Sequence, residues 1–192
     1  AADNWKDMEI CMGIVRKLHQ SGLRVGHSFD IRERIAFYER LCLQHGGIPF
    51  EDYKEVRGWM NELMDRLDQM NRPQCLCHID ANVDNFLMFE DGSAKLLDWE
   101  YAGMCDPIMD ISMSAIYSYY DAEQTEKLLE LYLKRKPLKE EYYSVFANAA
   151  LGGFLWCLWA VYKAALGEEF GEYTIIMYRY AKSYYKKLKA LS

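Results

Sequence analysis

Apolar residues recur at helical spacing along most of this chain. Ile10, Ile14 and Leu18, for example, lie one turn apart, as they would on the buried face of an amphipathic helix. Asp30 stands three residues before Glu33, a variant of the pair that caps the start of many helices. The pattern predicts helices over residues 5–19, 30–44, 50–70, 107–120, 122–134, 139–165 and 173–191.

The pattern changes between residues 75 and 110. Two short apolar runs, 86–89 and 94–97, are separated by four polar or small residues that include Asp91 and Gly92. An Asp-Gly pair between apolar runs is a strong hairpin signal, because glycine adopts positive φ without a Cβ clash. We therefore expect a mainly α fold of the α+β kind, helical with one small β-hairpin between two loops.

The hairpin would bring polar side chains together. Asn85 precedes its first strand and Asp98 follows its second, while Asp80 lies just upstream in the sequence His78-Ile79-Asp80. Oxygen ligands of this kind suit Mg²⁺ and a phosphate, and a carboxylate left free of the metal could accept a proton from an attacking hydroxyl. Protein kinases place an Asp, an Asn and a later Asp in these roles. Each motif alone is weak, but the combination predicts a phosphotransferase.

Composition narrows the class of protein. The chain has 192 residues, enough for one domain or one large lobe, and its net charge of -6 argues against a nucleic-acid partner. Cys75 and Cys77 have the wrong spacing for a zinc knuckle, and no second pair exists among the six cysteines. With no secretory signal before the first helix, we expect free thiols in a reducing, cytoplasmic setting.

One apolar stretch is long enough to cross a bilayer. Residues 145–162 carry no charge, and Asn148 is their only strongly polar side chain. The stretch holds two glycines, and acidic residues stand just upstream. We expect a buried central helix and no membrane insertion, since a helix that is apolar all round is either a core helix or a membrane span.

Two runs of residues resemble the choline/ethanolamine kinase family, in the aminoglycoside-phosphotransferase-like branch of the kinase fold. They are residues 78–85, HIDANVDN, and residues 97–103, LDWEYAG. Three further segments are similar to that family: RKLH at 16–19, FLWCLW at 154–159 and EFGEY at 169–173. The resemblance covers most of the chain and is greatest to the bacterial choline kinases of phosphocholine incorporation. The chain differs from protein kinases directly after Asp98, where Trp-Glu stands in place of Phe-Gly.

The resemblance implies a role for each polar residue of the site. Asp80 would be the catalytic base, taking the proton from the choline hydroxyl. Asn85 and Asp98 would bind Mg²⁺ and with it the ATP that donates the phosphoryl group, and Glu100 would support a second metal or the substrate end of the site. Two residues would brace the loop rather than react, namely His78 and Asp110.

The resemblance also implies a substrate pocket. Trp156 and Trp159 stand three residues apart on one helical face, and aromatic rings attract a quaternary ammonium through cation–π interaction. The alternative is that both are core residues, as aromatic stripes on apolar helices commonly are. Tyr101 and Tyr117 are further candidates for the choline wall. Eukaryotic members carry a carboxylate near Tyr117, so the acidic part of the ammonium site is in question.

The resemblance implies a single C-terminal kinase lobe over residues 1–192. Helices (1–72) would precede the catalytic loop, hairpin and metal loop (73–110), and further helices (111–192) would follow. No Gly-rich phosphate loop or strand lysine precedes the first helix, so we expect the N-terminal lobe to be a missing partner and the chain alone to have little activity. Open alternatives are a kinase for an aminoglycoside, sugar or homoserine, and a non-catalytic choline-binding fragment. Ethanolamine is an alternative substrate to choline.

Overall fold

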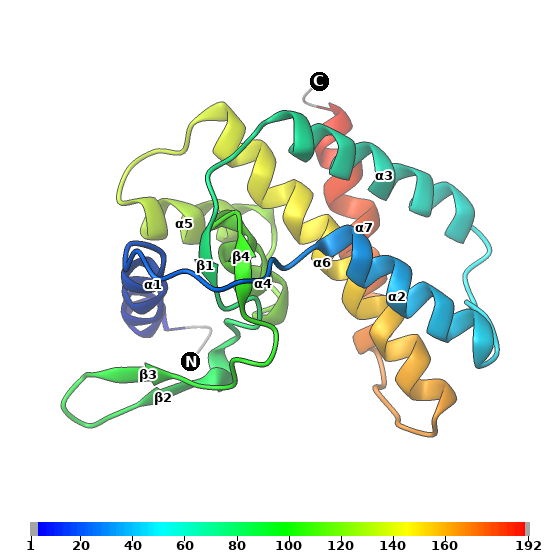
Figure 1. The fold of residues 1–192 in the computed structure, drawn as a ribbon, viewed down its shortest axis with the longest axis horizontal. Helices are drawn as coiled ribbons and strands as arrows, with labels where there is room; N and C mark the ends of the chain where they lie inside the picture. The colour runs from blue at the N-terminus through cyan, green and yellow to red at the C-terminus, as the bar shows by residue number, and fades with distance from the viewer. Residues whose placement is uncertain (1–3, 191–192) are drawn as a thin grey trace. The chain divides into compact units, whose positions relative to one another are not determined.

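A computed structural model describes residues 4–190, which are mostly helical (Figure 1). The chain divides into two compact units, each made of two segments. The first unit contains Ala1–Phe29 and Arg72–Asn148, and the second contains Asp30–Asn71 and Ala149–Ser192. All the polar residues predicted to take part in catalysis fall in the first unit.

The first unit combines helices with two small antiparallel sheets. Its elements are α1 (Trp5–His19), β1 (Cys75–Cys77), the short 3-10 helix η1 (Val83–Asn85), β2 (Phe86–Met88), β3 (Ala94–Leu96), β4 (Gly103–Cys105), α4 (Ile108–Tyr117), α5 (Ala122–Leu133) and the start of α6 (Lys139–Ala165). Strands β1 and β4 pair with Cys75 opposite Cys105, while β2 and β3 form the hairpin with Phe86 opposite Leu96. Helix α1 packs against both β1 and α5, and α4 packs against α5.

The second unit is helical. It contains α2 (Ile31–Gln44), α3 (Tyr53–Gln69), the remainder of α6 and α7 (Tyr173–Ala190). Helices α3 and α7 pack together through stacked rings, with Trp59 and Tyr185 4.7 Å apart between centroids. Asp52 accepts a hydrogen bond of 2.8 Å from the Tyr178 hydroxyl and pairs with Lys182, which joins the start of α3 to α7. Aromatic burial therefore contributes much of this core.

Most predicted helices are confirmed, and the differences have local causes. The predicted helix over 107–120 ends at Tyr117, because Tyr119 adopts φ +55° and cannot continue it. The helix predicted from residue 50 begins at Tyr53, because residues 50–53 form a turn closed by a backbone hydrogen bond from Tyr53 to Phe50. The predicted end of the last helix at residue 191 lies outside the described residues. The sequence reading missed the β1–β4 pair, whose strands are only three residues long.

The apolar helix α6 lies in the protein interior. It is long and apolar enough to cross a membrane, but 94% of its most apolar window is buried among other residues of the protein. A membrane span would instead present apolar side chains to lipid. This burial agrees with the core helix predicted from the sequence.

Gly153 lets α6 and α7 approach closely. A Cβ at this position would lie 2.6 Å from the Met177 carbonyl oxygen and 2.8 Å from the Tyr180 Cβ, so the backbones would have to separate. We expect Gly153→Ala to lower the free energy of unfolding by about 1–3 kcal/mol in urea denaturation. Gly58 of α3 is the matched control, since nothing lies within 4 Å of its Cβ position. Gly58→Ala should be neutral or stabilise by up to about 1 kcal/mol, and equal losses in both variants would contradict this account.

The loop between α5 and α6 is closed by an ion pair that should make stability depend on pH. Arg135 donates two hydrogen bonds of 2.7 Å to Glu141, and the Leu138 N–H donates a third. The Arg135 hydrogen bonds hold the pKa of the Glu141 carboxyl below its ordinary value of 4.5. A lowered folded pKa means that this stabilisation is present at neutral pH and is lost as the pH falls below about 4.5.

We therefore expect Glu141→Gln to cost about 1 kcal/mol at pH 7, a modest value because Arg135 is half-exposed. The difference from the unchanged protein should be smaller at pH 3 than at pH 7, because protonation of Glu141 at low pH weakens its pairing with Arg135. Urea unfolding at the two pH values measures it. Glu140→Gln, at the exposed neighbouring position, is the control and should change little. A cost that is the same at both pH values would contradict the ion-pair explanation.

Candidate active site

Asp80 is held in a fixed orientation by two amide side chains. It lies half-buried in the loop that follows β1. The Asn85 Nδ2 donates hydrogen bonds to its carboxylate at 2.9 Å and to its backbone carbonyl at 2.8 Å. The Asn82 Nδ2 donates to the other carboxylate oxygen at 3.1 Å. Each carboxylate oxygen retains a lone pair, so Asp80 can still accept a proton from a bound hydroxyl.

Asn82 is a site residue that the sequence reading missed. Its side-chain oxygen accepts hydrogen bonds from the backbone N–H groups of Asp84 and Asn85, capping η1. Asn is a preferred residue for such caps, and that preference was the only sequence signal available. Because the same side chain also reaches Asp80, the cap fixes the spacing between Asp80 and Asn85.

The hairpin brings Asp98 to the same end of the molecule. The Leu97 N–H donates to the Asn85 carbonyl at 2.9 Å, which closes the open end of the β2–β3 ribbon. Asp98 follows directly, is exposed, and adopts φ +60°. A positive φ outside glycine is a strained choice that is often found at functional sites. Asp80 and Asn85 are thus in direct contact, and a backbone hydrogen bond ties Leu97, the residue before Asp98, to Asn85.

His78 connects the two loops of the site. Its Nε2 donates to the Leu97 carbonyl at 2.7 Å, and its ring meets the Trp99 ring edge-on with 4.8 Å between centroids. The buried Nδ1 has no hydrogen-bond partner among the described residues. A ring held this way would keep the catalytic loop against the segment that carries Asp98, and its bracing role remains a prediction.

Asp110 supports the catalytic loop from α4. Its fully buried carboxylate accepts the backbone N–H of His78 at 2.9 Å and that of Ile79 at 2.7 Å. His19 adds a third contact of 2.9 Å, which the sequence reading did not anticipate. Ile79 adopts φ +72°, a costly conformation for a β-branched residue, immediately before Asp80. The hydrogen bonds from the His78 and Ile79 N–H groups to Asp110 can hold Ile79 in this conformation.

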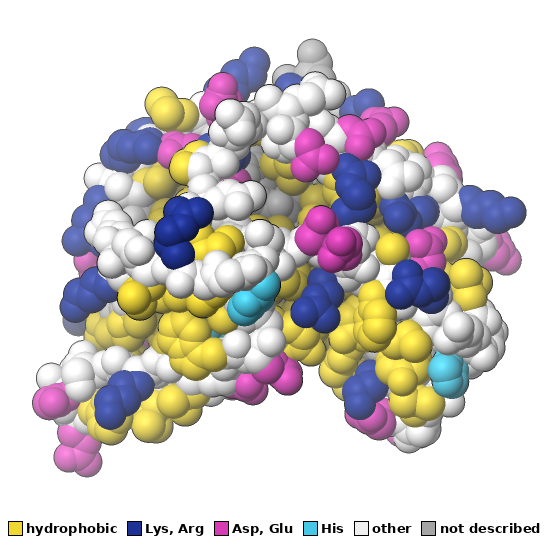
Figure 2. Space-filling view, viewed as in Figure 1, with side chains coloured by type: hydrophobic (Ala, Val, Ile, Leu, Met, Phe, Trp, Pro, Cys, Tyr) yellow, Lys and Arg dark blue, Asp and Glu magenta, His cyan; other side chains and the backbone are white. Residues whose placement is uncertain are grey.

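The remaining acidic and tyrosine candidates are less constrained. Glu100 is exposed in the turn two residues beyond Asp98, on the way from the hairpin to β4. Tyr101 and Tyr117 are half-buried. Figure 2 shows the hairpin extending to the lower left, with acidic side chains at its tip and apolar and basic ones along it. The hairpin therefore leaves apolar surface exposed, at Leu87, Met88 and Phe89.

The two tryptophans predicted to bind choline occur in the second unit and are not equivalent. Their rings meet edge-on with centroids 6.1 Å apart. Trp156 is only 4% exposed, which fits the alternative of a core residue. Trp159 is half-buried, and its ring contacts Phe170 at 4.9 Å and Tyr173 at 6.5 Å. Phe170 also lines an open pocket of about 420 Å³. Trp159 is therefore the better candidate for a ligand contact.

Comparison with known proteins places these residues in a family. Residues 8–144 match the phosphotransferase enzyme family, APH. Protein LicA of Haemophilus influenzae is 30% identical over 118 residues, which cover 57% of this chain and 44% of that protein. Choline kinase LicA from Streptococcus pneumoniae has 28% identity and a TM-score of 0.81, covering 94% of this chain and 63% of that one. A structure of LicA in complex with AMP has 29% identity and a TM-score of 0.80, covering 92% of this chain and 60% of that one.

The chain spans only part of each of these proteins. The matched part is less than half of the Haemophilus protein and under two thirds of each LicA chain of known structure. The protein-kinase-like fold expected from the sequence is confirmed, as is the phosphotransferase family.

Proposed function

The chain belongs to the phosphotransferase enzyme family, and from this premise we propose that it is the catalytic-loop part of a choline kinase. In this proposal the whole protein transfers the γ-phosphoryl group of ATP to the hydroxyl of choline. The observation that carries the proposal is the hydrogen-bonded arrangement of Asp80, Asn82 and Asn85 beside the open end of the hairpin. The similarity to choline kinase LicA supports the choice of substrate.

Asp80 is the proposed catalytic base. Phosphoryl transfer requires little covalent work from the protein, so positioning of the attacking hydroxyl accounts for most of its contribution. The amides of Asn82 and Asn85 fix both carboxylate oxygens, so Asp80 can accept the choline proton without first reorienting. Half-burial keeps this carboxylate partly shielded from water while a substrate can still reach it.

Asn85 and Asp98 are the proposed ligands of Mg²⁺, and the residues present suit this ion. Both contacts from Asn85 to Asp80 use Nδ2, so they leave the amide oxygen to a cation. Asp98 is an exposed carboxylate at the same end of the hairpin, and Glu100 stands two residues further on. Magnesium binds through one or two such carboxylates together with substrate phosphates, and when bound it neutralises charge on the ATP phosphates.

Trp159 is the proposed contact for the choline ammonium group. A quaternary ammonium cannot donate a conventional hydrogen bond, so aromatic faces are its natural partners. Trp159, Phe170 and Tyr173 gather three rings in the second unit, and Trp159 remains partly accessible. Trp156 supports this group mainly as a buried neighbour. Tyr101 and Tyr117 remain candidates for the same substrate.

We propose that the N-terminal lobe of the same protein completes the ATP site and that the whole enzyme works in the cytoplasm. The LicA structure in complex with AMP supports nucleotide binding by a close structural relative. In this proposal the 192-residue chain has little turnover by itself, because the phosphates of ATP must be positioned from both sides.

The test is an assay of the full-length protein that carries this chain. With ATP and Mg²⁺, we expect choline to be phosphorylated with a higher kcat/KM than ethanolamine or an aminoglycoside. Trp159→Ala should raise the KM for choline by about 10–30-fold, the equivalent of a desolvated cation–π contact, whereas Trp159→Phe should retain part of the affinity. Efficient phosphorylation of an aminoglycoside without that of choline would overturn the substrate assignment while leaving the phosphotransferase chemistry intact.

A further inference from the structure

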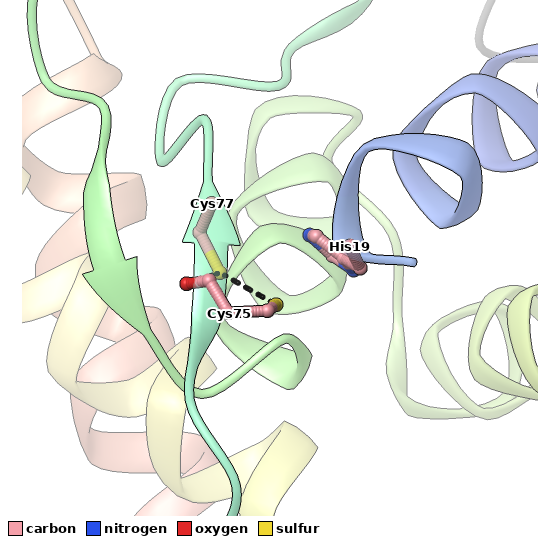
Figure 3. A group of neighbouring side chains, drawn as sticks. All are labelled: His19, Cys75 and Cys77. Carbon is pink, nitrogen blue, oxygen red and sulfur yellow. Dashed lines mark hydrogen bonds between the residues drawn. The ribbon is translucent and has the colours of Figure 1, made fainter. Parts of the chain in front are cut away.

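Three metal-binding side chains converge beside the catalytic loop, although no motif in the sequence joins them. Cys75 and Cys77 are two residues apart on β1, so both point to the same side of the strand. Their Sγ atoms are 3.7 Å apart. His19, the last residue of α1, faces them from the neighbouring helix (Figure 3). The two sulfur atoms and one imidazole nitrogen lie within 4.8 Å of one another.

We propose that His19, Cys75 and Cys77 form a binding site for a thiophilic divalent cation, of which Zn²⁺ fits best. Two thiolates and an imidazole are ligands that zinc prefers over magnesium or calcium. Two sulfurs bound to one tetrahedral zinc at about 2.3 Å are about 3.8 Å apart, close to the separation observed here. The site therefore needs little movement of the cysteines.

The histidine is already oriented by the protein. Its Nε2 lies 2.9 Å from the Asp110 carboxylate and its Nδ1 lies 2.8 Å from the Tyr132 hydroxyl. When a metal binds, one ring nitrogen of His19 would exchange its present hydrogen-bond partner for the ion, and the other would keep its hydrogen bond. A metal-bound histidine almost always has such a second partner, which fixes the ring and raises its basicity. Asp110 and Tyr132 are thus available to support the site.

The two cysteines would play different parts. Cys77 is fully buried, and its Sγ lies 3.5–3.6 Å from three carbonyl oxygens, those of Cys75, Cys105 and Asp106. Binding a metal as a thiolate would release the Cys77 proton to solvent. Cys75 is partly exposed, so in this proposal the ion and a water molecule as fourth ligand enter from its side. Three protein ligands and one water make a complete tetrahedral set.

The site would also be connected to the catalytic loop. The Asp110 carboxylate that contacts His19 also accepts the backbone N–H groups of His78 and Ile79. Any shift of the His19 ring toward the sulfurs changes the hydrogen bonds of a group that supports Asp80. This connection is a consequence of the site and is not needed for ion binding itself.

Zinc titration of the full chain tests the proposal. The protein is kept reduced with a phosphine and competes for Zn²⁺ with a chromophoric chelator. We expect one ion per chain, and substitution of Co²⁺ should give the charge-transfer absorption of a cobalt–thiolate bond. Cys75→Ala should weaken zinc binding at least about hundredfold and abolish that absorption. Because Cys75 is partly exposed, this variant should fold, which circular dichroism will verify.

Cys11→Ala is the matched control, since it removes a buried thiol from α1 that lies outside the cluster. It should bind zinc like the unchanged protein. His19→Gln provides a second variant should Cys75→Ala unfold, and it should weaken zinc binding while leaving the thiols in place. The proposal is overturned if the unchanged protein shows no saturable binding, or if the folded variant at Cys75 or His19 binds as tightly as the control.

Discussion

Asp80→Asn is expected to lower kcat for choline phosphorylation by about a thousandfold in the full-length protein, with little change in choline or ATP binding. General-base catalysis contributes about 10²–10⁴-fold, and the amide cannot accept the hydroxyl proton. The substitution keeps the size of the side chain but leaves one acceptor oxygen, so one of the two hydrogen bonds from Asn82 and Asn85 is lost. The hydrogen bond from Asn85 to the backbone carbonyl of residue 80 and those that Asp110 accepts from the loop do not involve this side chain, so the loop should remain in place. Steady-state kinetics and isothermal titration with choline measure the two effects separately.

Asp84 offers a matched control for this experiment. It lies four residues further along the chain, its side chain is exposed, and it takes no part in the proposed catalysis or metal binding. Asp84→Asn removes the same charge and should leave kcat within about twofold, as expected for a surface substitution away from the chemistry. If Asp80→Asn were to turn over at the normal rate, or if both variants lost activity equally, Asp80 would not be the base.

Asp98→Asn is expected to lower kcat/KM by at least about a hundredfold at physiological Mg²⁺, with partial recovery when Mg²⁺ is raised. Loss of a charged metal ligand weakens ion binding and the charge stabilisation that the ion provides. Asn is the suitable replacement, because it tolerates the positive φ that Asp98 adopts. The measurement is the Mg²⁺ dependence of the initial rate.

The control for Asp98 is Asp91→Asn at the tip of the same hairpin. Asp91 is exposed and contacts Ser93 within the turn, so its loss should affect the turn and leave the Mg²⁺ dependence unchanged. A reduced rate in Asp98→Asn that no concentration of Mg²⁺ improves would argue for a structural role. An unchanged rate would remove Asp98 from the metal site.

The sequence predicted most elements of the fold because their signals are local. The helix over residues 139–165 and the hairpin around Asp91 and Gly92 each depend on neighbours within a few residues. Helix ends were less certain, since they depend on single residues such as Tyr119, whose positive φ ends α4 early. The β1–β4 pair could not be predicted, because two three-residue strands carry almost no pattern of their own.

In the candidate site too, the residues close together in sequence were predictable and the contacts between distant segments were not. Asp80, Asn85 and Asp98 were predicted because the hairpin joins them across a short stretch of chain. Their supporting contacts come from distant segments: His19 in α1 reaches Asp110 in α4, a pairing that depends on how helices pack. The sequence argued against a zinc motif at the cysteines of β1, because their spacing is wrong for a zinc knuckle and no second pair exists. Their third neighbour, His19, lies on another element, so no local pattern could reveal it.

The family resemblance predicted that Trp156 and Trp159 both contact choline, but the two side chains differ in exposure. Helical spacing placed both rings on one face, and the rings do meet. Burial then separates them, because Trp156 is almost inaccessible and Trp159 is not. Spacing carries no information on exposure within an apolar helix, so only the structure could single out Trp159 as the better ligand contact.

The most direct test of the central claim is the position of a divalent ion in crystals of the full-length protein. Crystals grown with Mn²⁺ and a non-hydrolysable ATP analogue would locate the ion by its anomalous scattering. We predict an ion bound by the Asn85 amide oxygen, the Asp98 carboxylate and the phosphates, with the Asp80 carboxylate free of the metal and facing the acceptor side. An ion held elsewhere, or ligated by Asp80 in place of Asp98, would contradict the account.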